Sequence, residues 1–195
     1  LGVVPTIMIV KNIDANDTWT TYTTTTGNTK YLVLNTTAAT DTQTNRWNDT
    51  SPDSVNITLG NSTAVNNSGN NYLGLIFTDV QGYSKFGSYI GNGNADGPFA
   101  YTGFKPACLI RKRTDTTQDW YILDNKRLGY NPNNAYLFPN TTQTESDLTR
   151  VDFLSNGFKI NTTDTGDNAS GGTYIYIAFA SDPFVNSEGV AGNSR

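Results

Sequence analysis

The sequence contains no histidine, one cysteine, one methionine and two glutamates in 195 residues. Without histidine, the chain cannot build a Ser-His-Asp triad, a Cys-His pair, a His-ligated zinc site or a histidine general base. Cys108 has no partner for an internal disulfide, and we expect it to be a small buried residue in a strand. We therefore predict no enzymatic activity, no catalytic residue, no metal site and no cofactor.

Charge is also scarce. Charged residues make up 15% of the chain, against about 25% in an average soluble domain, and the net charge is −4 with no basic run. The chain thus lacks the electrostatic footprint that nucleic-acid binding requires. No signal peptide is visible, and no apolar stretch approaches the ~18 residues of a membrane-spanning helix. We therefore expect that the chain does not bind nucleic acid and does not insert into a membrane.

The carboxylates form no recognisable site. A glycosidase needs two of them at a fixed separation, but Glu145 lies in a low-complexity polar segment and Glu188 lies near the C-terminus. The Asp-rich stretches 14–17, 115–119 and 164–167 are typical of turns, in which Asp binds nearby backbone. A structural calcium ion stays open as an alternative, because carboxylate oxygens are its usual ligands.

What the sequence does contain is an internal repeat. Three pairs of segments align: 2–19 with 103–120 at an offset of 101, 31–35 with 136–140 at 105, and 68–77 with 170–179 at 102. We expect repeat unit 1–83, a connecting strand and glycine-rich turn at 84–99, repeat unit 100–185 and a C-terminal tail at 186–195, packed as one composite domain. Trp19 and Trp120 occupy equivalent positions, so we expect both to be buried.

Each unit consists of short β-branched and aromatic runs between clusters of Asn, Asp, Gly and Thr, which predicts an all-β sandwich or barrel. The expected strands are 6–11, 18–23, 30–35, 55–60 and 72–77, then 85–90, then 108–112, 120–124, 135–139, 157–161 and 173–179. No window shows a helical period, so we expect almost no helix. The glycine run 91–97 is followed by Pro98 and alternating aromatics rather than by a helix, which favours a turn over a phosphate-binding loop.

Trp47 is the candidate ligand-binding residue. It has no equivalent in the second unit and lies in the polar stretch TNRWNDT. An exposed indole there would stack on a sugar ring, while Asn45, Arg46 and Asn48 supply hydrogen bonds. The alternative is that Trp47 plugs one edge of the sandwich.

Four stretches of the second half carry a resemblance to a known family. They are YSKFGSYIGNGNADGPFAYTGFKPACLIRKR, DWYILDNKR, DFLSNGFKIN and GGTYIYIAFASDPFV. This motif order resembles a domain of tailed-bacteriophage structural proteins, especially tail fibres and adhesins of phages from aquatic bacteria. The resemblance implies a component of the virion surface with a concanavalin-like or jelly-roll β-sandwich. The first unit lacks DFLSNGFK, so a site built on that motif would occur once, near Asp152 to Lys159.

We therefore expect a tail-fibre or adhesin module that binds host-surface glycans. A capsid-surface decoration or head-fibre protein with a purely structural role is the alternative, and a polysaccharide depolymerase is a third. Its partners would be other virion proteins or copies of itself, for instance in a homotrimer. Because no counterpart of the strand 85–90 precedes the first unit, we also expect one module of a longer polypeptide, with strand 6–11 covered by an upstream segment or a neighbouring subunit.

Overall fold

The computed structural model describes residues 1–127 and 131–183; Glu188 and the predicted tail 186–195 lie outside these ranges. The chain divides into two compact units, Leu1–Thr78 and Asp79–Arg195, called unit 1 and unit 2 below. Both are built from antiparallel sheets, which confirms the all-β prediction. The helices of the described residues are single turns: α1 (Thr44–Trp47), α2 (Thr63–Asn66) and α3 (Thr165–Asn168).

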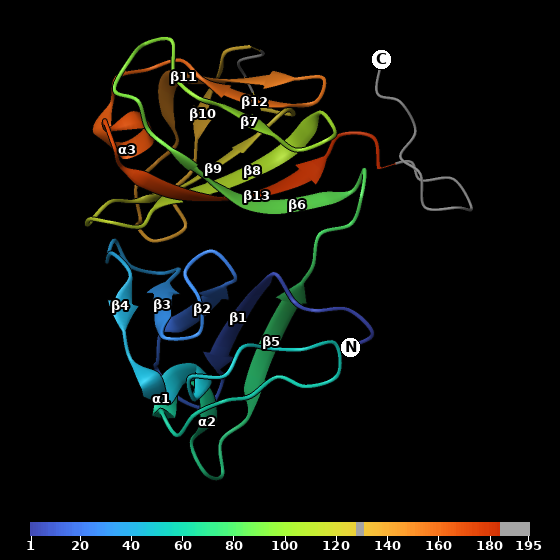
Figure 1. Ribbon diagram of the computed structural model, residues 1–195. Helices are drawn as coiled ribbons and strands as arrows, with labels where there is room; N and C mark the ends of the chain where they lie inside the picture. Colours follow the sequence, from blue (N-terminus) through green and yellow to red (C-terminus); the bar gives the residue numbers. More distant parts are fainter. Residues whose placement is uncertain (128–130, 184–195) are drawn as a thin grey trace. The chain divides into compact units, whose positions relative to one another are not determined.

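Unit 1 is one five-stranded sheet in the order β4-β3-β2-β1-β5 (Figure 1). Its strands are β1 (Ile7–Asn12), β2 (Trp19–Thr23), β3 (Lys30–Val33), β4 (Asp41–Thr42) and β5 (Tyr72–Phe77). Alternate residues of the strands point to one face, where α1, α2 and the segment before α2 close the core. The buried residues of this core are Met8, Val10, Tyr22, Tyr31, Val33, Trp47 and Val65.

Unit 2 is a sandwich of two four-stranded sheets, β6-β13-β8-β9 and β10-β11-β12-β7 (Figure 1). The strands are β6 (Ser84–Ile90), β7 (Phe99–Tyr101), β8 (Pro106–Arg113), β9 (Trp120–Asp124), β10 (Asn133–Tyr136), β11 (Ser146–Leu154), β12 (Gly157–Ile160) and β13 (Thr173–Ala180). Aromatic side chains from both sheets fill the core between them. Among its buried residues are Tyr89, Leu109, Tyr121, Phe153, Phe158 and Tyr174.

The two units repeat the same strand pairings in the same register. Equivalent pairs are Lys11–Trp19 with Lys112–Trp120, Ile7–Phe77 with Cys108–Phe179, and Thr21–Leu32 with Ile122–Leu137. The hydroxyl of Tyr72 donates to the carbonyl of Thr63 (2.6 Å), and Tyr174 repeats this bond with Thr165 (2.8 Å). These matches follow the offsets of the sequence repeat and support the predicted duplication.

Part of the strand prediction is wrong. Residues 55–60 form no strand, because the backbone there packs against α1: Gly60 donates its N–H to the carbonyl of Arg46 (2.9 Å), and a Cβ on Gly60 would lie 2.1 Å from the carbonyl oxygen of Asn45. The low-complexity segment around Glu145 instead leads into the nine-residue strand β11. The expected connector contains β6, which pairs with β13 inside unit 2.

The first strand is not an edge strand. β1 pairs with β2 on one side and with β5 on the other, so the prediction that residues 6–11 need an outside partner is wrong. The physical reason is that β5 returns from 60 residues further along the chain to cover β1. The edge strands of unit 1 are the two-residue β4 and the six-residue β5, and no strand of the described ranges pairs with the outer side of β5 (Figure 1).

Burial of the predicted core residues is mixed. Trp120 is buried as predicted, whereas Trp19 is half-buried. Cys108 lies in β8 as predicted but is also half-buried, and desolvation raises the pKa of its thiol, which disfavours the reactive thiolate. Within residues 1–127 and 131–183, no helix has the length and apolar character needed to cross a membrane.

Candidate functional site

Trp47, the candidate sugar platform, lies inside the core of unit 1. Its exposed fraction is 0%, its indole Nε1 donates to the carbonyl of Lys30 (3.0 Å), and its ring meets Tyr22 edge-on with 5.7 Å between centroids. An indole without exposed surface cannot stack on a sugar, so the prediction of an exposed Trp47 is wrong. The single turn of α1 directs its one apolar side chain onto the sheet, although the polar neighbours suggest a loop.

The three polar neighbours have two different roles. The Arg46 guanidinium lies 4.6 Å from the ring centroid of Tyr31 and donates to the hydroxyl of Ser62 (2.6 Å), so it fastens α1 to the sheet and to the N-terminus of α2. Asn45 and Asn48 are exposed and line a pocket of about 520 Å³. Two of the four predicted residues therefore do lie at a cavity.

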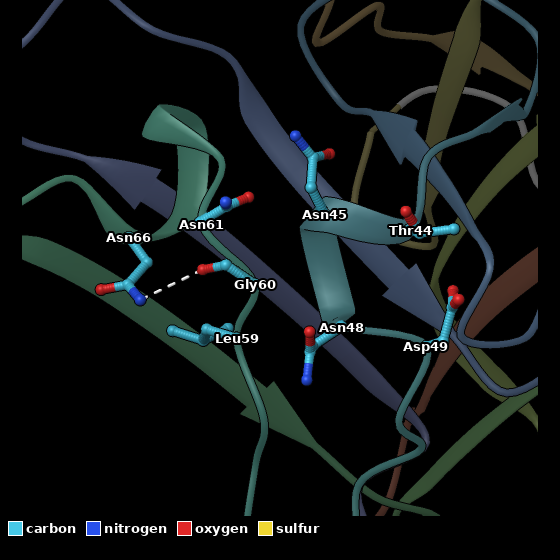
Figure 2. A pocket seen from close by; sticks show the side chains of 8 residues that line it. All are labelled: Thr44, Asn45, Asn48, Asp49, Leu59, Gly60, Asn61 and Asn66. Carbon is cyan, nitrogen blue, oxygen red and sulfur yellow. Dashed lines mark hydrogen bonds between the residues drawn. The ribbon is translucent and has the colours of Figure 1, made fainter.

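This cavity, the amide pocket, is lined by Thr44, Asn45, Asn48, Asp49, Leu59, Gly60, Asn61 and Asn66 (Figure 2). Asn48 and Asp49 have φ values of 50° and 48°, a left-handed conformation that Asn and Asp tolerate better than most residues. The side chains of Asn45, Asn48 and Asn61 make no hydrogen bond to another residue of the described chain. The pocket thus presents three amide side chains with unused donors and acceptors beside one carboxylate, that of Asp49.

In unit 2, a turn fills the place that is equivalent to the amide pocket. Asn66 donates its side-chain N–H to the carbonyl of Gly60 (3.1 Å), and its equivalent Asn168 donates to the carbonyl of Thr162 (2.8 Å). Around Asn168, however, the glycine run 91–97 closes as a turn, as predicted. The backbone N–H of Asn92 donates to Asn168 Oδ1 (2.7 Å), and Asn168 Nδ2 donates to the carbonyl of Asn94 (2.7 Å). Asn168 is consequently 0% exposed, whereas Asn66 is exposed at the amide pocket.

A second candidate site lies on unit 2 and consists of two aromatic side chains, which we call the aromatic shelf. Phe99 and Tyr101 alternate with the buried Ala100 along β7, and their exposed fractions are 44% and 63%. A glycine leaves room for the Phe99 ring, since a Cβ on Gly157 would lie 2.7 Å from Phe99 Cζ. The Tyr101 ring lies against Gly103, where a Cβ would make an ordinary contact of 3.6 Å with the hydroxyl oxygen. Outward-facing aromatics over glycine backbone are typical of a binding surface rather than of a core.

A pocket of about 340 Å³, the shelf pocket, adjoins Tyr101. Its lining residues are Asp79, Gln81, Gly82, Ser84, Lys85, Tyr101, Thr102 and Gly103. Lys85 forms an ion pair with Asp79, whose other oxygen accepts the N–H of Phe86 (2.9 Å). The two charges balance, so the pocket offers hydrogen bonds to a neutral ligand without selecting a net charge.

The motif DFLSNGFK supports this shelf from the neighbouring strand β12. Gly157 and Lys159 pair with Tyr101 and Phe99 across the ladder. Lys159 Nζ lies 2.6 Å from Asp96 Oδ1, and this hydrogen bond lowers the pKa of Asp96. Lys159 Nζ also donates to the carbonyl of Gly97 (2.6 Å). Since unit 1 lacks the motif, the shelf has no counterpart there.

Sequence reasoning missed the shelf although one signal was present. Phe99 and Tyr101 alternate in the stretch PFAYTGF directly before a glycine. The same alternation is compatible with rings that point inward, and in most half-buried strands they do. The register of β7 against β12 decides whether the two rings point inward or outward. The residues of β12 lie almost sixty positions further along the chain, so the local sequence does not contain this information.

The Asp-rich turns bind their own chain. Asp164 Oδ1 accepts the N–H of Gly166 (2.8 Å) at the start of α3, and Asp115 pairs with Arg113 (2.8 Å). Asp14 Oδ2 accepts the backbone N–H of Asn71 (2.6 Å). These bonds fit the turn interpretation, and the described part of the chain holds no group of three metal-ligating side chains.

Comparison with known proteins gives one match. A family model described as Domain of unknown function (DUF7483) matches residues 1–183. No curated protein and no solved structure matches the chain. The match spans both units, and the amide pocket and the aromatic shelf both lie within it.

Proposed function

The chain belongs to the DUF7483 family, and we propose that it is a virion-surface module that attaches a tailed bacteriophage to host-surface glycans. The resemblance of the stretches around DFLSNGFK to tail-fibre and adhesin domains supports the place in the virion. The observation that carries glycan binding is the aromatic shelf, where Phe99 and Tyr101 stand exposed beside the shelf pocket.

The chemistry of the shelf suits a neutral pyranose. One face of a sugar ring presents C–H groups, which pack on the negative face of an aromatic ring. The ring hydroxyls both donate and accept, so they match the Asp79 carboxylate and the Lys85 ammonium that line the pocket. Two rings on successive outward positions of one strand are about 7 Å apart, a spacing that lets consecutive sugars of a chain contact Tyr101 and Phe99 in turn.

A purely structural role in the particle is the second candidate, and the open edge of β5 favours it. In that role the module would associate with other virion proteins or with copies of itself. A depolymerase has less support, since Glu145 is held by Arg127 (2.7 Å) and Asp152 accepts a hydrogen bond from Asn161 (2.7 Å).

Glycan binding by the 195-residue chain tests the proposal. A glycan array identifies the best ligand class, and calorimetry with chitohexaose, cellohexaose and mannohexaose measures affinity. We expect Tyr101→Ala to weaken binding at least about tenfold, which corresponds to about 1.4 kcal/mol, and Tyr101→Phe to retain most of it because the ring remains.

Ile90→Ala is the matched control, because Ile90 is an apolar residue of the same unit with a similar exposed fraction of 65%. It should leave the affinity unchanged. Equal losses in Tyr101→Ala and Ile90→Ala would indicate unspecific adhesion, and absence of binding across the array would refute the glycan proposal in favour of the structural role. Release of reducing ends from the bound polysaccharide would instead favour the depolymerase.

A further inference from the structure

In unit 2, β6 and the glycine run after it cover β13 and α3 without interruption. β6 pairs with β13 over seven residues, from Ser84–Phe179 to Ile90–Thr173. Gly91 then exchanges two backbone hydrogen bonds, donating to Gly172 and accepting from Gly171 (2.9 Å each). The turn that follows closes over Asn168, as described above. One segment, 84–97, therefore fills a strand edge, a glycine corner and the surroundings of an asparagine.

In unit 1, all three equivalent places are open. The outer edge of β5 has no partner strand in the described residues, and its side chains Leu73, Leu75 and Ile76 are exposed. Gly69 N–H and the Asn70 carbonyl, the equivalents of Gly171 and Gly172, make no hydrogen bond to another described residue. Asn66 faces the amide pocket, where unit 2 has its turn.

We propose that the outer edge of β5 and the amide pocket form a single acceptor site for a strand–turn segment of the same kind as residues 84–97, supplied from outside these 195 residues. The strand would add antiparallel to β5 by backbone hydrogen bonds. The Asn- and Gly-rich turn would then enter the amide pocket and hydrogen-bond to Asn66. This inference does not depend on glycan binding, which takes place on unit 2.

The nature of β5 supports strand addition. The sequence YLGLIF contains no charged residue and no proline, which are the usual devices that keep an edge strand from pairing. Gly74 occupies the position that Tyr176 has in unit 2, so β5 has no side chain at its middle that could crowd an added strand. A second copy of β5 could pair with this edge, but it would leave the amide pocket empty. Only a strand followed by a turn fills both.

A chain with an added segment tests the proposal. Residue 102 is equivalent to Leu1 at the offset of 101, so a second copy of residues 84–101 is placed directly before Leu1. We expect the backbone amides of β5 to exchange at least about tenfold more slowly than in the 195-residue chain. We also expect the side-chain amide signals of Asn66 to shift. Glycan binding should stay the same.

The control carries the same extension with proline in place of the copied Gly87 and Tyr89, because N–H groups alternate along a strand and these positions point the same way as Gly91, which donates to Gly172. Proline has no N–H, so the strand of the control cannot pair. The proposal predicts no protection of β5 in this control. It is refuted if the two extended chains exchange alike, or if Asn66 keeps its signals while β5 becomes protected. It is also refuted if the 195-residue chain is already a dimer with slowly exchanging β5, because a second copy is then the occupant.

Discussion

A buried ion pair in unit 2 stands where unit 1 has two valines. Val10 and Val65 pack in the core of unit 1, and their equivalents are Arg111 and Asp167, which are also buried. Arg111 Nη1 lies 2.5 Å from Asp167 Oδ1, and Nη2 donates to the hydroxyl of Tyr136 (2.9 Å). Burial is the largest single influence and lowers the pKa of Arg111, but the Asp167 charge together with Tyr136 and Tyr89 outweighs it, so the pKa is raised. Arg111 therefore keeps its charge inside the core.

The two units together predict how this pair responds to substitution. Asp167→Val leaves the Arg111 charge buried without its partner and should cost about 3–5 kcal/mol of unfolding free energy. Arg111→Met should cost about 2 kcal/mol, because Asp167 keeps Arg150 Nη1 at 2.9 Å. The double variant removes both charges and approaches the apolar arrangement of unit 1, so we expect it to lie within about 1 kcal/mol of the parent. The coupling energy is then about 4–8 kcal/mol.

The assay is native-state hydrogen exchange of the β8 and β13 amides, which reports the stability of unit 2 separately from unit 1. Arg150 retains Asp164 at 2.8 Å in every variant, so it is not left unpaired. A double variant as unstable as the sum of the single ones would refute the reasoning. It would mean that the loss of packing, and not the uncompensated charge, sets the cost.

Three more predictions follow from burial. Trp47→Ala should destabilise unit 1 by about 3–5 kcal/mol in urea unfolding, and Trp19→Ala clearly less, because only Trp47 is fully buried; equal costs would contradict this. Desolvation lowers the pKa of Lys112 to about 8, so between about pH 8 and 10 the unfolded chain binds more protons than the folded one and stability rises by up to about 1.4 kcal/mol per pH unit. Lys112→Met should abolish this rise of stability with pH in a series of thermal melts. If the rise persists in the variant, another titratable group causes it. Asn168→Ala should cost unit 2 about 3 kcal/mol, since it orphans several buried groups, whereas Asn66→Ala should cost unit 1 under about 1 kcal/mol; similar losses would show that the amide pocket is already filled.

Most of the strands were predictable because short β-branched and aromatic runs between turn residues are local signals. The anchors Trp19 and Tyr72 recur as Trp120 and Tyr174 at nearly constant offsets, and the same pairings recur with them. What failed is the part of each unit between those anchors. There unit 2 forms β11, whereas unit 1 forms the single turn of α1. The sequence offset does not reveal that the two units differ in this segment.

Exposure was the harder property to predict. The residues next to Trp47 in sequence are polar. Its burial depends on the sheet that α1 packs against, and the core there consists of residues that precede Trp47 in sequence and residues that follow it. On β7 the small Ala100 is buried while the larger Phe99 and Tyr101 face outward, the reverse of the usual preference. Such a reversal leaves two aromatic rings exposed to water, and this exposure is the reason for proposing a binding surface there.

The differences between the units suggest a division of labour. Unit 2 keeps its own β6 and glycine run, closes its core with an ion pair and carries the aromatic shelf on the motif that unit 1 lacks. Unit 1 keeps the common strand pairings but leaves β5 and the amide pocket open. If unit 2 contacts the glycan and unit 1 receives a neighbouring segment, the two functions separate by substitution. Tyr101→Ala would then weaken glycan binding without changing docking at β5, and a charged residue at Leu75 would block docking while glycan affinity stays the same.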